Sequence, residues 1–350
     1  MGRGPTNLAF MLAVFGSACA SIPEAPQPVG APAAPDVASA EPLRIYTPVE
    51  QAEATRVPAP YPALPLSVGV SPRRPRQASV VTVRIIVPPG PALERPTATL
   101  AERDVLLVRD DLGWIGLAGL PVDGSGLLEL DIRGRRNGVE EHERRVIRVE
   151  AREYPSTRIR ISAGAASDPE VDARIARERQ LIRSRLTAST DVWLPEDPFD
   201  WPRPPVRTSP FGEGRVFNGA VRSRHLGLDL RGRRGQGTYA PAAGRVLLTG
   251  SFFYQGNAVY LDHGLGLVTA YFHHTSIVVE EGDIVSPGQL LGRVGSTGRS
   301  TAPHLHWSAY VNGESVDPES LIGFLLIPKT AADVEAAETQ ASEDNGGDWK

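Results

Sequence analysis

The sequence is dominated by short apolar–polar alternations that turn-forming residues interrupt at close intervals. Glycine and proline account for 35 and 32 of the 350 residues. Alternation with a period of two is typical of strands that bury one face, and glycine or proline turns separate such strands. We therefore expect a mainly β chain, and a hydrophobic content of 41% is ample for buried cores.

Residues 63–162 contain about seven short strand candidates. Turn signals such as Pro88-Pro89-Gly90 and Asn137-Gly138 separate them. About a hundred residues of this kind are typical of an immunoglobulin-like β-sandwich. His142 stands alone among charged residues in an expected hairpin, so we interpret this module as a spacer. The candidates are Leu66–Val70, Ser79–Val87, Val105–Arg109, Trp114–Leu117, Gly126–Ile132, Arg144–Ala151 and Thr157–Ile161.

Residues 167–188 carry a helical apolar repeat. Asp168, Pro169 and Glu170 are typical of a helix start, with an N-cap, a proline in the first turn and an early acidic residue. Arginine and glutamate fill the other faces. We expect a linker helix that packs between two domains. Its apolar stripe consists of Val171, Ile175, Ile182 and Leu186.

Residues 1–20 are expected to be an export signal. Arg3 precedes the apolar run 8–15, which is too short to span a bilayer. The residues before Cys19 resemble the end of a bacterial lipobox, in which Cys19 would carry the lipid anchor, although Gly16 departs from that pattern. Ala18-Cys19-Ala20 also fits a cleavage site that releases a soluble protein. The single cysteine of the chain favours the lipoprotein.

The segments that flank the expected domains lack strand or helix periodicity. Residues 21–62 are rich in Ala and Pro, and residues 328–350 are acidic. Such segments bury too little apolar surface to offset their ordering entropy, so we expect a disordered tether and a disordered tail. The net charge of −4 argues against a nucleic-acid partner, which favours a basic patch.

Two histidine-containing segments more than seventy residues apart carry the chemistry. His225–Asp229 and His304–His306 both alternate with leucines and read as strands, so alternate side chains share a face. Gly227 leaves room for an ion between His225 and Asp229, and the leucines are expected to point into the opposite layer. Imidazole and carboxylate are ligands of Zn²⁺, and three protein ligands with a water are typical of a catalytic site.

Residues 210–321 resemble the lysostaphin/LytM-type zinc metallopeptidases of bacterial cell walls. Ordered motifs over about a third of the chain make the resemblance specific. Besides the His225–Asp229 segment, the matching stretches are Ser209–Gly212, Ala240–Val246, Asp262–Gly266, Tyr271–His273, Val285–Gln289, Gly295–Gly298 and Pro303–Trp307. The resemblance implies that residues 205–327 form an antiparallel, all-β peptidase domain.

The resemblance also implies roles for individual residues. His225, Asp229 and His306 match the zinc ligands of the family, which leave a net charge of +1 at the metal and lower the pKa of bound water. His304 matches the general base. His273 matches the histidine that polarises the scissile carbonyl and stabilises the oxyanion.

Two neighbouring histidines are interpreted as structural. His274 follows His273 and faces the other way on a strand, so only one of the pair can reach the metal. His263 is expected in a turn, as a hydrogen-bonded residue. Residues 295–301 lack a phosphate-loop ending and lead into a strand, so we interpret them as a wall of the binding cleft.

Together these features predict a zinc-dependent endopeptidase that hydrolyses peptide cross-links of bacterial peptidoglycan in the cell envelope. Zn²⁺ would be the cofactor and peptidoglycan peptide stems the substrate. The alternative is a non-catalytic LytM-type regulator that binds the wall or activates amidases. Such members have lost metal ligands, whereas this sequence keeps the three candidate ligands and both auxiliary histidines, which favours the enzyme.

Overall fold

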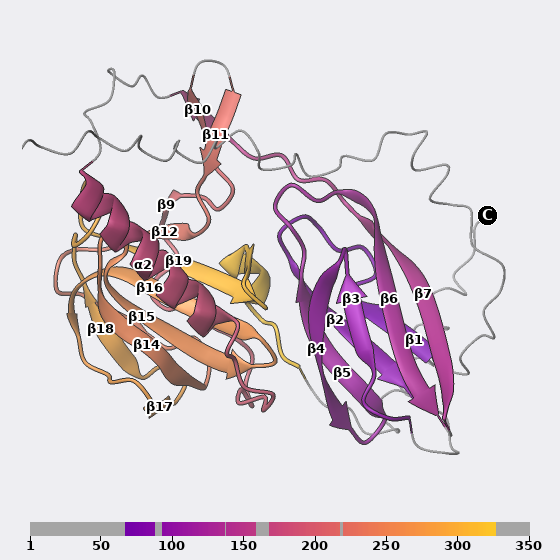
Figure 1. Cartoon of the computed structure of the whole chain (residues 1–350). Coiled ribbons are helices and arrows are strands. Elements are labelled where there is room, and N and C mark those ends of the chain that lie inside the picture. Colours follow the sequence, from indigo (N-terminus) through magenta and orange to yellow (C-terminus); the bar gives the residue numbers. More distant parts are fainter. Residues whose placement is uncertain (1–66, 88–92, 137, 159–167, 218–219, 327–350) are drawn as a thin grey trace, which may run out of the picture. The chain divides into compact units, whose positions relative to one another are not determined.

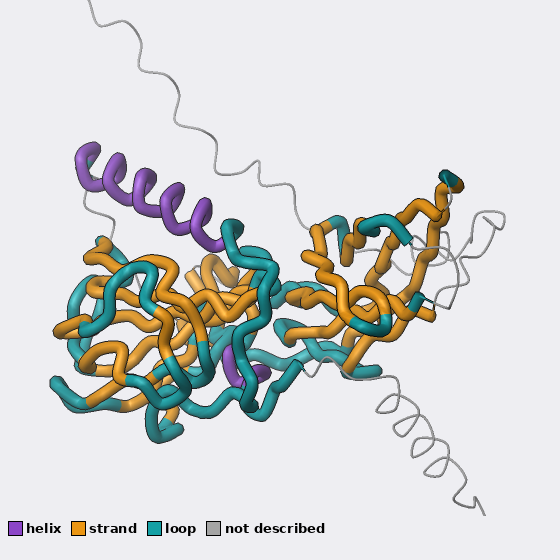
Figure 2. The backbone as a smooth tube through the Cα atoms, turned by 90° about the horizontal axis from the view of Figure 1, so that it is seen from below, coloured by secondary structure: helices purple, strands orange, loops and turns teal. Residues whose placement is uncertain are grey.

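Strands account for most of the regular structure. The computed structural model describes residues 67–87, 93–136, 138–158, 168–217 and 220–326 (Figures 1 and 2). These ranges hold one α-helix, α2 (Pro169–Leu186), and one 3₁₀ turn, η2 (Pro318–Leu321). The prediction of a mainly β chain is confirmed. The segments predicted as export signal, tether and tail lie outside the described residues. Within the described ranges, no helix has the length and apolar character needed to cross a membrane.

Seven strands form an N-terminal antiparallel sheet in the order β1-β2-β5-β4-β3-β6-β7. The immunoglobulin-like topology stays a prediction. The four-residue strand β3, which the sequence did not reveal, pairs with β4 and β6. The strands are β1 (Ser67–Ser71), β2 (Val80–Ile86), β3 (Thr97–Leu100), β4 (Arg103–Asp110), β5 (Gly113–Gly119), β6 (Gly126–Arg136) and β7 (Val139–Val149).

The alternating residues of this sheet meet in one core. Val81, Val83 and Ile85 of β2 are completely buried, as are Leu130 and Ile132 of β6. Strand residues two apart share a face, so this burial pattern follows directly from the sequence alternation.

The last strand expected in the N-terminal module pairs elsewhere. Thr157 lies in β8 (Ser156–Arg158), which pairs in parallel with β10 (Gly214–Phe217) rather than with the N-terminal sheet. β10 also pairs with β11 (Ala220–Arg224), which completes a three-stranded sheet.

A ten-stranded antiparallel sheet forms the C-terminal half of the described chain, which confirms the predicted antiparallel, all-β architecture; the domain bounds 205–327 stay a prediction. Its main path is β17-β14-β15-β16-β19-β12-β9; β18 pairs with β13 and β16, and β20 pairs with β19. The strands are β9 (Arg207–Ser209), β12 (Leu228–Arg231), β13 (Gly237–Tyr239), β14 (Gly244–Phe252), β15 (Gly256–Gly264), β16 (Leu267–Ile277), β17 (Ile284–Val285), β18 (Leu290–Val294), β19 (His304–Val311) and β20 (Glu314–Val316).

Helix α2 begins as predicted, with the Asp168 side chain accepting a hydrogen bond from the Glu170 backbone N–H at 2.9 Å. The helix lies over the C-terminal sheet (Figure 1). Ile182 and Leu186 of its apolar stripe join a cluster of residues from β14, β15 and β16. The helix thus lies against β14 and its neighbours, whereas the sequence suggested a position between two domains.

Candidate metal centre

Strand pairing brings the two histidine-containing segments together. β12 and β19 are antiparallel neighbours, with Asp229 opposite His306 and Leu228 opposite Trp307. Directly opposed residues project to the same face. Asp229 and His306 therefore point the same way, while Leu228 and Trp307 are buried in the layer on the other side.

His225 reaches this face from a loop rather than from a strand. β12 starts only at Leu228, because His225 pairs with the preceding turn: its N–H donates to the Glu213 carbonyl at 2.9 Å, and its own carbonyl accepts from Gly212 at 2.8 Å. The predicted strand is thus wrong for residues 225–227. Leu226 is 41% exposed and does not enter the opposite layer.

Three candidate ligand atoms nevertheless converge. His225 Nε2 lies 3.0 Å from His306 Nδ1 and 3.1 Å from Asp229 Oδ1, and His306 Nδ1 lies 2.8 Å from the same oxygen. Within the described part of the chain, this is the group of His, Cys, Asp and Glu side chains with metal-ligand spacing.

Hydrogen bonds on the outer side fix how both imidazoles are protonated. His225 Nδ1 lies 2.9 Å from the Pro210 carbonyl, which can only accept. His306 Nε2 lies 2.9 Å from Ser308 Oγ, whose own hydrogen is donated to the Leu226 carbonyl at 3.0 Å. A neutral imidazole carries one N–H. Both protons are therefore held outward, and the inner nitrogens present lone pairs.

The donor set fits a divalent cation. Two imidazole lone pairs and a carboxylate oxygen at such separations repel one another unless positive charge lies among them. Tetrahedral Zn²⁺ with bonds of about 2.05 Å places its ligands about 3.3 Å apart, close to the distances around Asp229. Outer partners of this kind hold metal-binding histidines in the required orientation.

Gly227 makes room for the His306 ring. A Cβ at this position would lie 2.2 Å from His306 Nε2 and 2.7 Å from Ser308 Oγ. The expectation that an ion fits between His225 and Asp229 stays a prediction, and the missing side chain also admits the His306 imidazole beside them.

His304 lies at the edge of the cluster. Its Nδ1 lies 2.8 Å from the Ala302 carbonyl, and its Nε2 lies 3.5 Å from Asp229 Oδ1. The proton is again held on the outer nitrogen. Nε2 therefore faces the cluster and can accept a proton. His304 is not one of the three residues with metal-ligand spacing.

His273 also presents a bare nitrogen. Its Nδ1 donates to the Thr297 carbonyl at 2.8 Å, and its ring centroid lies 4.8 Å from that of His304 and 5.9 Å from that of His306. The residue has a positive φ of 65°, a costly conformation that the surrounding bonds maintain.

The other two histidines of the sheet are structural. His274 is buried on the opposite side, where its Nε2 lies 2.7 Å from Thr238 Oγ1. His263 lies in β15 rather than in a turn, but it is hydrogen-bonded as predicted, to the Ala243 carbonyl and to Thr269 Oγ1, both at 2.7 Å.

Burial and neighbouring charge set the protonation states. Burial alone would raise the pKa of Asp229, but hydrogen bonding and positive charge from the adjoining His225 and His306 outweigh it and lower that pKa well below its usual range. With both ring protons held outward, a cation among the three groups would supply that positive charge instead. Burial lowers the pKa of His306 and brings the pKa of His273 to about 4. At neutral pH Asp229 is therefore a carboxylate and His306 and His273 are neutral imidazoles, and metal binding requires deprotonated ligands.

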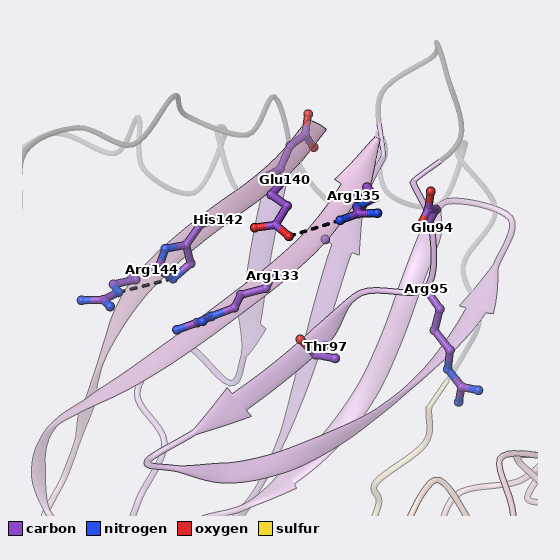
Figure 3. Close-up of a pocket in the computed structure, with 10 residues that line it drawn as sticks. Glu94, Arg95, Thr97, Arg133, Arg135, Glu140, His142 and Arg144 are labelled. Atoms are coloured by element: carbon purple, nitrogen blue, oxygen red, sulfur yellow. Dashed lines mark hydrogen bonds and ion pairs between the residues drawn. The ribbon is translucent and has the colours of Figure 1, made fainter. Parts of the chain in front are cut away.

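A charged pocket of about 470 Å³ lies on the N-terminal sheet beside the β6–β7 hairpin (Figure 3). Its charged groups largely compensate one another: Arg135 pairs with Glu140 at 3.3 Å, and His142, predicted to stand alone, lies 2.5 Å from Asp131. Arg144 is also within 3.2 Å of Asp131. In the part of the chain that the structure describes, the group of side chains with metal-ligand spacing lies at Asp229 and not in this pocket.

The atoms that hold the histidine rings in place could not be predicted from the sequence. Three of them are backbone carbonyls, those of Pro210, Thr297 and Ala302, whose position does not depend on the type of side chain. Ser308 is the exception, because it lies two residues after His306 on the same strand and so must share its face. Residues 295–301 lead into β19 as predicted, and Thr297 holds His273, while their role as a cleft wall stays a prediction.

A His–Asp–His cluster flanked by two further imidazoles offers both metal ligands and proton-transfer groups, the combination that metal-assisted hydrolysis uses. Residues 223–318 match the family described as Peptidase family M23, and the chain belongs to this family. The crystal structure of a peptidase M23 from Pseudomonas aeruginosa superimposes with a TM-score of 0.53 at 29% identity, covering 71% of this chain and 96% of that one.

Curated relatives match over a shorter stretch. The DD-carboxypeptidase/endopeptidase Mpg of Neisseria meningitidis serogroup B is 41% identical over 97 residues, which are 28% of this chain and 22% of the relative. The murein hydrolase activator NlpD of Salmonella dublin is 31% identical over 134 residues, or 37% and 33% of the two chains. The chain thus spans a third or less of these two relatives.

Proposed function

We propose that the chain is a zinc-dependent endopeptidase that hydrolyses peptide cross-links of bacterial peptidoglycan in the cell envelope. The observation that carries this proposal is the convergence of candidate ligand atoms from His225, Asp229 and His306, each held by its surroundings. The name of a further relative, the peptidoglycan DD-endopeptidase ShyA of Vibrio cholerae, which is 40% identical over 93 residues, supports peptidoglycan as the substrate.

In the proposed reaction His225, Asp229 and His306 hold the cation. When bound, Zn²⁺ supplies Lewis-acid chemistry that makes water acidic enough to attack an amide at neutral pH. His304 takes a proton from the attacking water at Nε2, because its Nδ1 proton is already donated to Ala302. It then delivers this proton to the departing amine.

His273 is proposed to stabilise negative charge on the scissile carbonyl oxygen. In the free protein its Nε2 carries no proton, and burial lowers its pKa to about 4. It can donate to that oxygen only once a proton reaches Nε2. The proton that His304 takes from water goes to the departing amine, so the proton on His273 Nε2 must come from solvent as negative charge develops on the substrate.

Export is part of the proposal, because the substrate lies outside the cytoplasm. The signal-like residues 1–20 and the lipid anchor on Cys19 stay predictions that mass spectrometry of the mature chain would test. A chain retained in the cytoplasm with residues 1–20 intact would contradict them.

The decisive experiment compares the wild-type chain with His304→Ala on purified sacculi. We expect stoichiometric zinc in both proteins, because His304 is not a proposed ligand, and release of soluble muropeptides by the wild type only. Removal of general acid–base catalysis should lower the rate by about 100-fold or more. Metal content is measured by mass spectrometry and products by chromatography.

The second candidate function is that of a non-catalytic activator of other wall hydrolases, which the similarity to NlpD suggests. A zinc-loaded wild type that releases no muropeptides but stimulates a purified amidase would favour this function and reject the endopeptidase. The complete set of ligand and auxiliary histidines supports the enzyme.

A further inference from the structure

An arginine-flanked aromatic turn lies beside the metal centre. The turn joins β14 to β15 and presents Phe253 and Tyr254, whose ring centroids are 5.0 Å apart and nearly perpendicular. Three guanidinium groups approach these rings: Arg174 lies 5.9 Å from Phe253, and Arg179 and Arg299 each lie 5.8 Å from Tyr254. We call these five residues the arginine–aromatic surface.

The turn is held from two directions. On one side Glu178 of α2 accepts the Phe253 backbone N–H at 2.7 Å and also binds Arg174 Nε at 2.7 Å. On the other side the Arg299 backbone N–H donates to the Tyr254 carbonyl at 2.9 Å. The arrangement is therefore built by hydrogen bonds as well as by ring contacts.

This surface is continuous with the backbone that positions His273. The Gln255 carbonyl accepts the His273 backbone N–H at 2.9 Å, and Thr297, two residues before Arg299, accepts from the His273 ring. The two loops touch so closely that a Cβ on Gly298 would lie 2.2 Å from the Gly256 nitrogen. A polymer bound at the metal centre has the arginine–aromatic surface as its neighbour.

The local charge is opposite to that of the chain. Arg174, Arg179 and Arg299 are exposed, and Glu178 is the acid bonded among them, whereas the whole chain has a net charge of −4. Guanidinium groups bind carboxylates in planar, two-point contacts, and adjacent rings fix their orientation. The chemistry therefore suits a polymer that carries repeated carboxylates.

We propose that the arginine–aromatic surface binds free carboxylates of peptidoglycan stem peptides and so retains the wall polymer beside the metal centre. The proposal deepens the proposed function by naming a substrate contact. Part of that contact comes from α2, which lies outside the family match at residues 223–318.

The test measures binding to purified sacculi by co-sedimentation of the full chain. All proteins carry His304→Ala, so that binding is measured without hydrolysis. We expect the double variant Arg179→Gln/Arg299→Gln to bind about fivefold to tenfold more weakly. The control Arg177→Gln/Arg245→Gln, which removes two other exposed arginines from α2 and β14, should bind like its parent. Equal melting temperatures of all variants would establish intact folding.

A second arm changes the substrate. Conversion of the sacculus carboxylates to amides should weaken binding of the parent protein by a similar factor and should leave the double variant unaffected. The inference is overturned if the double variant binds like its parent, or if amidated sacculi bind the parent equally well. Binding and hydrolysis are measured separately. If binding to sacculi depends on the arginines but the wild type releases no muropeptides, the endopeptidase proposal is rejected and the proposed carboxylate contact is retained.

Discussion

Gly227→Ala should disable metal binding without removing a ligand. The new Cβ would lie 2.2 Å from His306 Nε2, against an ordinary carbon–nitrogen contact of about 3.4 Å, so the ring must move by about 1.2 Å. It cannot move toward Ser308, because Ser308 Oγ would itself be 2.7 Å from the Cβ. On its flat side it is stacked on Phe272, with centroids 5.1 Å apart and an interplanar angle of 6°.

A shift of this size exceeds what the metal tolerates, because ligand distances vary by only about 0.2 Å. Loss of an orienting partner alone lowers metal affinity by about 10-fold to 100-fold. Since the variant displaces the His306 ring itself, we expect zinc affinity to fall by about 100-fold or more. That corresponds to about 2.7 kcal/mol of binding free energy. Muropeptide release at limiting zinc should fall in parallel.

The assay is a competition titration of zinc against a fluorescent chelator, with far-UV circular dichroism as a check of folding. Gly69→Ala is the matched control, because Gly69 also has an ordinary backbone conformation and a Cβ added there would meet nothing within 4 Å. Zinc affinity of Gly227→Ala within about threefold of the wild type would refute the packing argument, since that is well below the expected loss.

Three further predictions address the supporting structure. Ser308→Ala removes the acceptor of the His306 proton and should lower zinc affinity by about 10-fold to 100-fold in the same titration; an unchanged affinity would contradict the tautomer assignment. Burial lowers the pKa of His263 to about 4, below the value of about 6.5 in an unfolded chain. The unfolded state therefore binds more protons between these values, and stability is lost as pH falls. Between pH 7 and pH 5 His263 should lower the free energy of unfolding by about 2 kcal/mol, measured by urea unfolding with a chelator present. His263→Gln should make the free energy of unfolding depend less on pH in this range; an unchanged pH dependence would contradict the assignment to His263. Asp168→Ala removes the cap of α2 and should cost about 1 kcal/mol of unfolding free energy, measured by thermal melting, and no shift would argue that α2 frays independently of the sheet.

The sequence predicted the elements that depend on local pattern. Alternation located most strands of both sheets, and the Asp168-Pro169-Glu170 start located α2. Two predictions of strands failed. β3 was missed because it is only four residues long, and residues 225–227 were predicted as a strand because they alternate like one, although His225 pairs with the turn at 212–213. Local alternation does not reveal which backbone a residue pairs with, because pairing is decided by tertiary contacts.

The candidate site was predictable in its side chains and not in its backbone. His225, Asp229 and His306 lie together as the motifs indicated, because β12 and β19 are neighbours. Which nitrogen of each ring points inward depends on carbonyls such as those of Pro210 and Ala302, and carbonyls are identical at every position of a sequence. Their placement emerges only from the fold.

The pairing of β8 with β10 means that backbone pairing joins the region of the peptidase motifs to residues upstream of position 205. β10 has β11 on one side and β8 on the other, and Thr157 of β8 donates to Glu213 at 2.5 Å. A fragment that starts at residue 205 would leave one edge of β10 bare, and exposed edges invite pairing with other chains. A shortened fragment that keeps the candidate metal centre and both neighbours of β10 therefore calls for a cut upstream of Ser156.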